Sequence, residues 1–214
     1  MTTFEHAALG INGVLACGLH RRWGWKIVAV GGVSAIAPDW DGLPMFIDMA
    51  RFEHGHRVWG HNVFACLLLA LALGALDYRF DWFGRIARWL VQFGPMRDVR
   101  EHVGEMRATF SSSGLMIWIL VAFVAALSQI PADAVVSGGK GLSDWALKPL
   151  WPVSNLEVIY PMVPWGNVGV TVIFAIAMIA QAKKPSRSQT IAIVSLVSMC
   201  LYIFIWGAWV GRAA

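Results

Sequence analysis

Residues 114–130 read GLMIWILVAFVAALSQI, an apolar run that contains no charged side chain. A helix that crosses a membrane needs about 20 predominantly apolar residues. Two shorter apolar runs, 4–19 and 27–37, are rich in small residues, which let helix backbones approach closely in lipid. Three further long runs share the character of the first: 62–76, 166–182 and 190–210. The pattern predicts an all-α fold, a polytopic transmembrane helical bundle with four to six membrane helices.

The composition agrees with a membrane protein. Of the 214 residues, 57% are hydrophobic and 14% are charged, whereas a soluble domain has about 25% charged residues. We expect one membrane-embedded domain over 1–214, in which a motif-bearing part, 4–154, precedes two transmembrane helices within 166–210. The net charge of +4 follows the loops, so we expect no nucleic acid as partner. The cysteines stand singly, which predicts neither disulfides nor a thiolate zinc site: Cys17, Cys66 and Cys200.

The positions of Lys and Arg predict the orientation. If all six runs cross the membrane, twelve of the 17 Lys and Arg lie on one side, in the loops 20–26, 78–113 and 183–189. Loops rich in Lys and Arg stay in the cytoplasm, so we expect the segments 38–61 and 131–165 to face the outer side of the inner (plasma) membrane.

One cytoplasmic stretch has a helical pattern of its own. In residues 79–94, aromatic and aliphatic side chains recur at helical spacing opposite Arg85 and Arg88. This pattern predicts an interfacial amphipathic helix that lies on the membrane surface.

Ionisable side chains concentrate at the outer boundary of the predicted membrane helices. The run PDWD at 38–41 is followed by HGHR at 54–57 and by His61, and topology brings His6 and Asp133 to the same side. Ionisable groups are costly to bury at a membrane, so they indicate a functional site. Aspartate and histidine are also ligands that zinc and similar divalent metals prefer. The sequence therefore predicts a divalent metal site at this boundary.

The spacing of the histidines limits which of them could bind together. If residues 53–64 form a helix, then His54, Arg57 and His61 share one face at i, i+3 and i+7. His56 would then lie about 100° round from Arg57. The two histidines of the HGHR run could not both join His61 as equivalent ligands.

The carboxylates leave more than one arrangement open. In an extended turn, Asp39 and Asp41 would point to opposite sides, so one could bind a metal while the other orients a ligand. Arg57 suits an anionic group such as phosphate, and its alternative role is an ion pair that orients one of these carboxylates. Gln129 and Asp133, at i and i+4, would share one face of the fourth long helix and could complete the site.

In this order, the motifs resemble the YdjM-like family of predicted membrane-bound metal-dependent hydrolases. Gln129 stands where the family pattern has His, and Gly60 and Asn62 replace Thr and Ser. The family is distantly similar to zinc-dependent phospholipase C. The resemblance extends over about residues 4–154 and rests on His6, Pro38-Asp39-Trp40-Asp41, His56-Arg57-Val58-Trp59-Gly60-His61, Gln129-Ile130-Pro131-Ala132-Asp133 and Trp151-Pro152.

The resemblance implies hydrolysis of a phosphoester by a metal-activated water, with zinc as the expected metal. Asp41 and Arg57 would be catalytic, through orientation of the water and binding of the substrate anion. Because the site would lie at head-group depth, we expect membrane lipid as partner, and a phospholipid or lipid-linked phosphoester as substrate. The implied metal ligands are His6, Asp39, Asp41, His56, His61 and Asp133. Two secondary candidates are His54 and Gln129.

Two other functions stay open. A non-catalytic membrane protein could use the polar cluster, or a structural metal, to hold its helices together, and Gln129 favours this alternative. A transporter for metal or small solutes is disfavoured, because the polar residues gather at one end of the predicted bundle rather than at its middle.

Overall fold

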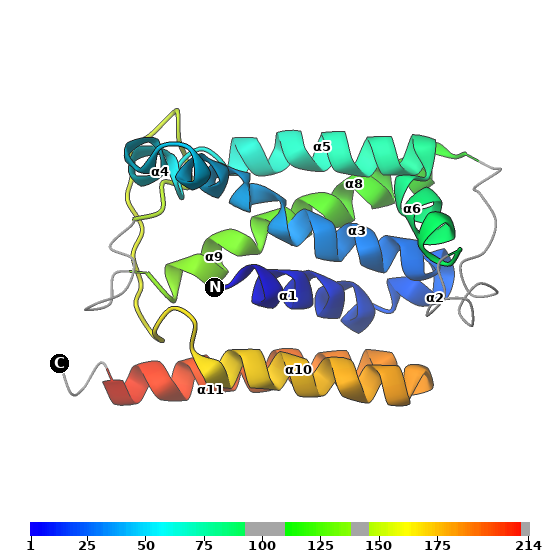
Figure 1. Ribbon diagram of the computed structural model, residues 1–214. Helices are drawn as coiled ribbons and strands as arrows, with labels where there is room; N and C mark the ends of the chain where they lie inside the picture. The colour runs from blue at the N-terminus through cyan, green and yellow to red at the C-terminus, as the bar shows by residue number, and fades with distance from the viewer. Residues whose placement is uncertain (93–109, 138–145, 211–214) are drawn as a thin grey trace.

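The computed structural model describes residues 1–92, 110–137 and 146–210, and most of these residues are helical. The long helices run roughly side by side along a common axis (Figure 1). The predicted all-α membrane bundle is thereby confirmed. The elements in chain order are α1 (Thr3–Ala16), α2 (Leu19–Trp23), α3 (Trp25–Ile36), η1 (Ala37–Phe46), α4 (Met49–Gly55), α5 (Val63–Phe80), α6 (Trp82–Leu90), α8 (Ser112–Leu127), α9 (Gln129–Ala134), α10 (Val168–Lys183), η3 (Pro185–Arg187) and α11 (Ser188–Val210).

The bundle has a central helix, α1, with neighbours on two sides. On one side α3 packs against α1, and α8 packs against both α3 and α5. On the other side α10 and α11 pair with each other and pack against α1 (Figure 1). The contact between α1 and α3 depends on small residues, since a Cβ atom added at Gly10 would lie 2.3 Å from the carbonyl oxygen of Gly31.

Three helical segments are long and apolar enough to cross a membrane: Val63–Phe80, Ser112–Ala134 and Pro185–Trp209. The apolar helix α10 is shorter, with 16 residues. At 1.5 Å per residue, α1 and α3 extend only about 21 and 18 Å, less than the ~30 Å of a hydrocarbon core. Both are short, as predicted, and α3 lies inside the bundle, where Ile27 and Val30 are fully buried.

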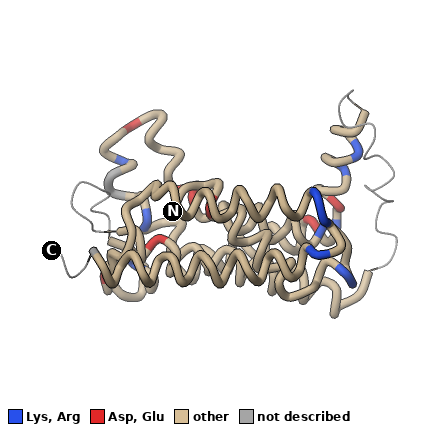
Figure 2. The backbone as a smooth tube through the Cα atoms, turned by 90° about the horizontal axis from the view of Figure 1, so that it is seen from below, with Lys and Arg blue, Asp and Glu red and all other residues tan. Residues whose placement is uncertain are grey.

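The two ends of the bundle differ in charge. The short elements α2, α6 and η3 gather at the end opposite the N-terminus, where Lys and Arg are concentrated (Figure 2). This end collects the described parts of the three loops that were predicted to share one side; residues 93–109 lie outside the described ranges. The segment η1–α4 and helix α9 lie at the other end, beside the N-terminus (Figure 1).

Helix α6 occupies most of the stretch that was predicted to be amphipathic, although residues 93 and 94 lie outside the described ranges. Trp82 and Trp89 are more than half exposed. The helix is anchored at its inner face, because the buried Asp81 pairs with Arg88 at 3.0 Å and with Lys26 of α3 at 2.8 Å.

Candidate metal centre

The carboxylates Asp39 and Asp41 lie in a 3-10 helix that follows α3 directly. The expected extended turn is wrong: η1 begins at Ala37, and Pro38 stands at its start, where a proline ring fixes the backbone angle that a helix needs. As a result, both carboxylates face the same histidine, His61, from two sides of its ring.

The segment that carries His56 and His61 is not helical. Helix α4 ends at Gly55, Arg57 has a positive φ of 61°, and α5 begins only at Val63. The supposed helix over 53–64 is therefore wrong, and Arg57 and His61 do not share a helical face. The side chain of His54 lies outside the described part of the structure, so its role stays a prediction.

Close backbone packing forces this irregular path. A Cβ atom at Gly60 would lie 1.9 Å from the carbonyl oxygen of Pro38, so only glycine fits there. The N–H of Gly60 also donates to Oδ2 of Asp41 at 2.8 Å. Asn62 caps α5, because its Oδ1 accepts from the backbone N–H of Ala65 at 2.8 Å.

The imidazole of His61 is the centre of the cluster and is fully buried. Its Nδ1 donates to Oδ2 of Asp41 at 3.0 Å. Its Nε2 lies 3.4 Å from Oδ1 of Asp39 and 3.2 Å from Oδ2 of Asp133. Among the described residues, no group makes a hydrogen bond of good geometry with this Nε2. A neutral imidazole that donates from Nδ1 would thus point a lone pair at two carboxylate oxygens, an arrangement that calls for a cation.

Helices α1 and α9 supply the other side of the centre. Nε2 of His6 lies 3.2 Å from Oδ1 of Asp133, and both residues are buried. The amino group of Met1 also contacts this oxygen. The ligand atoms of His6, Asp39 and Asp133 all lie within 4.8 Å of one another, which is close enough for them to hold one metal ion.

Asp41 lies behind the histidines. Its Oδ1 accepts from Nδ1 of His56 at 3.2 Å, while its Oδ2 accepts from His61 and Gly60. A carboxylate on the Nδ1 side of a metal-binding histidine fixes the tautomer and aims Nε2 at the metal. The geometry favours this orienting role for Asp41, and its role as a direct ligand stays a prediction. The ring of His56 stacks on Phe52, with 4.7 Å between ring centroids.

The charges around His61 and Asp41 shift both pKa values. Burial by itself would lower the pKa of the His61 imidazole, but its contacts with Asp133, Asp39 and Asp41 outweigh burial and hold that pKa well above its usual range. Burial would raise the pKa of the Asp41 carboxyl, but the donors from His56 and His61 outweigh it and lower that pKa. Without a metal, the site therefore favours a proton on His61.

Arg57 is buried, and its guanidinium points toward α9 rather than η1. One nitrogen lies 3.8 Å from Oδ1 of Asp133, and another donates to the hydroxyl of Ser137. The ion pair that was considered with Asp39 or Asp41 is thus made with Asp133 instead. The sequence interpretation missed Ser137, which donates to the backbone oxygen of Asp133 at 2.6 Å; its position one turn after Asp133 was the available signal.

Gln129 joins the cluster through its amide, and its Nε2 donates to Oδ1 of Asp39 at 2.7 Å. Helix α8 ends at Leu127, and α9 begins at Gln129. The break follows from Pro131, which has no N–H to donate to the carbonyl of Leu127. Both Gln129 and Asp133 contact the centre, as their shared face predicted.

A cavity of about 730 Å³ opens beside these residues and is lined by Asp39, His56, Arg57 and Asp133 among others. The structure thus brings together eight predicted site residues from η1, the 56–61 segment, α1 and α9: His6, Asp39, Asp41, His56, Arg57, His61, Gln129 and Asp133.

The fold and this centre define a polytopic helical membrane protein with a buried histidine–aspartate cluster at one end. The chain belongs to the YdjM inner membrane protein family, whose family model matches residues 1–212. This membership and the three apolar segments indicate an inner-membrane location. No curated protein and no solved structure matches the chain. The predicted family is confirmed, whereas hydrolase activity and the similarity to zinc-dependent phospholipase C have no support from these comparisons and stay predictions.

Proposed function

We propose that the protein is a metal-dependent hydrolase of phosphoester bonds. The observation that carries the proposal is Nε2 of His61, which faces oxygens of Asp39 and Asp133 at 3.4 and 3.2 Å with no hydrogen bond of good geometry among the described residues. Either a proton or a metal ion would relieve the repulsion among these atoms. The nearby His6 supports a metal, because one of its ring nitrogens lies within 4.8 Å of oxygens of the same two carboxylates, Asp39 and Asp133.

The donor set suits zinc, since imidazole nitrogens and carboxylate oxygens are its usual ligands beside thiolates. His6, Asp39, His61 and Asp133 would hold the ion. A bound zinc ion would supply a Lewis acid that activates water and stabilises negative charge as it develops on the phosphoester.

The remaining side chains would orient and bind. Asp41 keeps the Nδ1 proton of His61 in place, so that Nε2 stays available as a ligand. Arg57 lines the cavity and carries a buried positive charge suited to a phosphate oxygen. In the reaction, water adds to phosphorus, the bond from phosphorus to the alcohol oxygen breaks, and that oxygen takes up a proton.

We also propose that the site opens on the outer side of the inner membrane. The concentration of Lys and Arg at the opposite end of the bundle supports this orientation (Figure 2).

A second candidate is a non-catalytic polar cluster that holds the helices together. Two observations favour it: the amide of Gln129 already donates to Asp39, and the amino group of Met1 and the guanidinium of Arg57 already partner Asp133. In that case the carboxylates would be neutralised by the chain itself.

Zinc titration of detergent-purified protein distinguishes the metal-dependent hydrolase from the non-catalytic polar cluster. We expect the wild-type protein to bind zinc, and His61→Ala and Asp39→Ala to lose it while circular dichroism stays helical. Glu157→Gln is a matched control, since this half-exposed carboxylate lies outside the cluster. A wild-type protein that takes up no zinc would sink the proposal. Zinc binding without cleavage of a phosphodiester, whether soluble or in lipid vesicles, would leave a structural role for the metal.

A further inference from the structure

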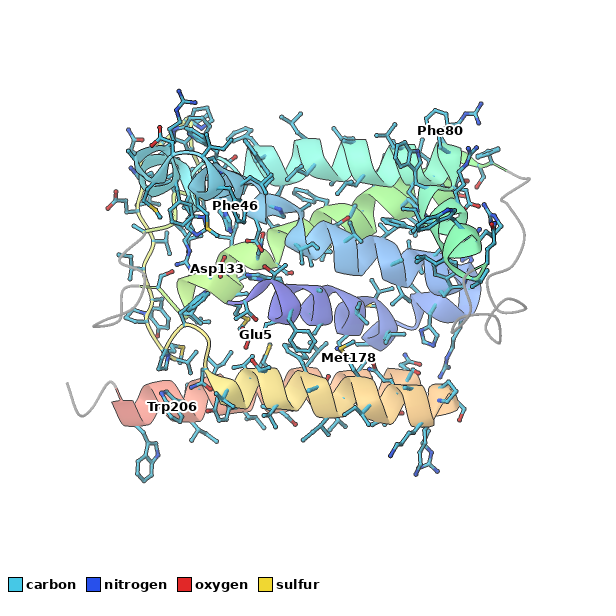
Figure 3. All side chains as sticks on the ribbon, viewed as in Figure 1. Glu5, Phe46, Phe80, Asp133, Met178 and Trp206 are labelled. Atoms are coloured by element: carbon cyan, nitrogen blue, oxygen red, sulfur yellow. The ribbon has the colours of Figure 1, made fainter. Side chains whose placement is uncertain are left out.

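The cavity beside the metal centre has an apolar rim. Its polar lining includes Asp39 and the buried side chains of Arg57 and Asp133, whereas the later part of η1 lines it with exposed apolar side chains. Figure 3 shows Phe46 on the same end of the bundle as Asp133. The apolar side chains that line the cavity are Met1, Leu43, Met45, Phe46, Phe52 and Trp165.

The rim side chains turn outward as well as toward the cavity. Leu43 is 61% exposed and Phe46 77%, and the adjacent Ile47 is 90% exposed. No charged residue interrupts the run from Gly42 to Ile47. An exposed apolar run of this kind, at the end of membrane-spanning helices, is typical of a segment that lies in the lipid interface. Trp165, half-exposed on the other wall, is of the residue type enriched at that interface.

A buried cation next to an apolar rim matches the two halves of a phospholipid. Resting on the proposed function, we infer that the substrate is a membrane phospholipid, whose phosphate reaches Arg57 while its acyl chains stay against the rim of Leu43, Met45 and Phe46. A protein partner would not need the rim to be continuous with a cavity that ends at the metal centre. The continuity is what a lipid requires, because its head group and chains are covalently joined.

The test compares cleavage of a lipid with cleavage of its own head group. Zinc-loaded protein is given vesicles of equimolar phosphatidylethanolamine and phosphatidylglycerol, and separately the deacylated, water-soluble diesters of the same head groups. We expect kcat/KM to be higher for the lipid by about tenfold or more, and the variant Leu43→Ser/Phe46→Ser to remove that preference. Both side chains are highly exposed, so the variant should fold.

The double variant Val153→Ser/Leu156→Ser is the matched control, since both residues are exposed apolar side chains that do not line the cavity, and it should keep the preference. Equal rates on lipid and deacylated diester, or a preference that survives in the rim variant, would overturn the lipid inference and leave the hydrolase intact. Failure of the wild-type protein on both substrates would overturn the proposed function, and the inference with it.

Discussion

The orienting role of Asp41 can be tested with the substitution Asp41→Asn, which keeps the shape of the side chain. The carboxylate accepts from Gly60 N at 2.8 Å, from Nδ1 of His61 at 3.0 Å and from Nδ1 of His56 at 3.2 Å. Asparagine has a single acceptor oxygen, so it can retain at most the two bonds now made to Oδ2.

The expected loss of zinc affinity in Asp41→Asn follows from these hydrogen bonds. A hydrogen bond to a charged group contributes about 1.5–3 kcal/mol and a neutral one about 0.5–1.5 kcal/mol. The two retained bonds therefore weaken by about 2 kcal/mol together, which corresponds to roughly 30-fold in affinity. Mutation of such a partner behind a metal-binding histidine typically costs about 10–100-fold, so we expect zinc affinity to fall by about 30-fold.

The assay is a zinc titration of purified protein in competition with a chelator, with thermal unfolding recorded for each variant. Glu157→Gln removes one carboxylate outside the centre and should leave zinc affinity unchanged. A folded Asp41→Asn protein that binds zinc as tightly as wild type would refute the orienting role. A loss as large as that of Asp39→Asn would instead make Asp41 a ligand.

Four further outcomes are expected. Gly60→Ala should lower the thermal stability by the equivalent of about 1–3 kcal/mol, because the new Cβ would meet the carbonyl oxygen of Pro38. Gly13→Ala should keep or raise the stability, because no atom lies within 4 Å of its new Cβ, and the reverse order of the two variants would contradict the packing. Gln129→His should raise zinc affinity, since it replaces an amide with a ligand, and an unchanged titration would place this position outside the metal's reach. Because the pKa of His61 is raised, zinc must displace its proton, so zinc affinity should fall about tenfold per unit of pH below that pKa; a pH-independent affinity would exclude His61 as ligand. In a background without native cysteines, Val153→Cys should react with a membrane-impermeant reagent added outside the inner membrane, and labelling only from the cytoplasm would reverse the orientation.

The overall arrangement of the bundle was predictable from the sequence for a simple geometric reason. Each apolar run must reverse direction relative to the one before, so residues at alternate run ends meet at one end of the bundle. This is why the sequence alone could place His6, His61 and Asp133 together, and in the structure both histidines contact Asp133.

The local backbone of the site was not predictable in the same way. The 3-10 helix at Asp39 and the irregular path at Arg57 depend on the approach of Gly60 to Pro38, a contact between segments that periodicity does not report. The pairing of Arg57 with Asp133 was missed for the same reason, because the positive φ of Arg57 turns its side chain toward α9.

The contact between His6 and Asp133 joins residues 127 positions apart in the chain. Synthesis begins at the N-terminus, so His6 enters the membrane well before its carboxylate partner has been translated. An unfinished chain has His6 and Asp39 but not Asp133, and so holds only a fragment of the group that is proposed to bind a cation. The centre is therefore assembled late, after α8 and α9 have been inserted beside α1. Translation order thus delays any metal-dependent chemistry until the N-terminal two-thirds of the bundle is in place.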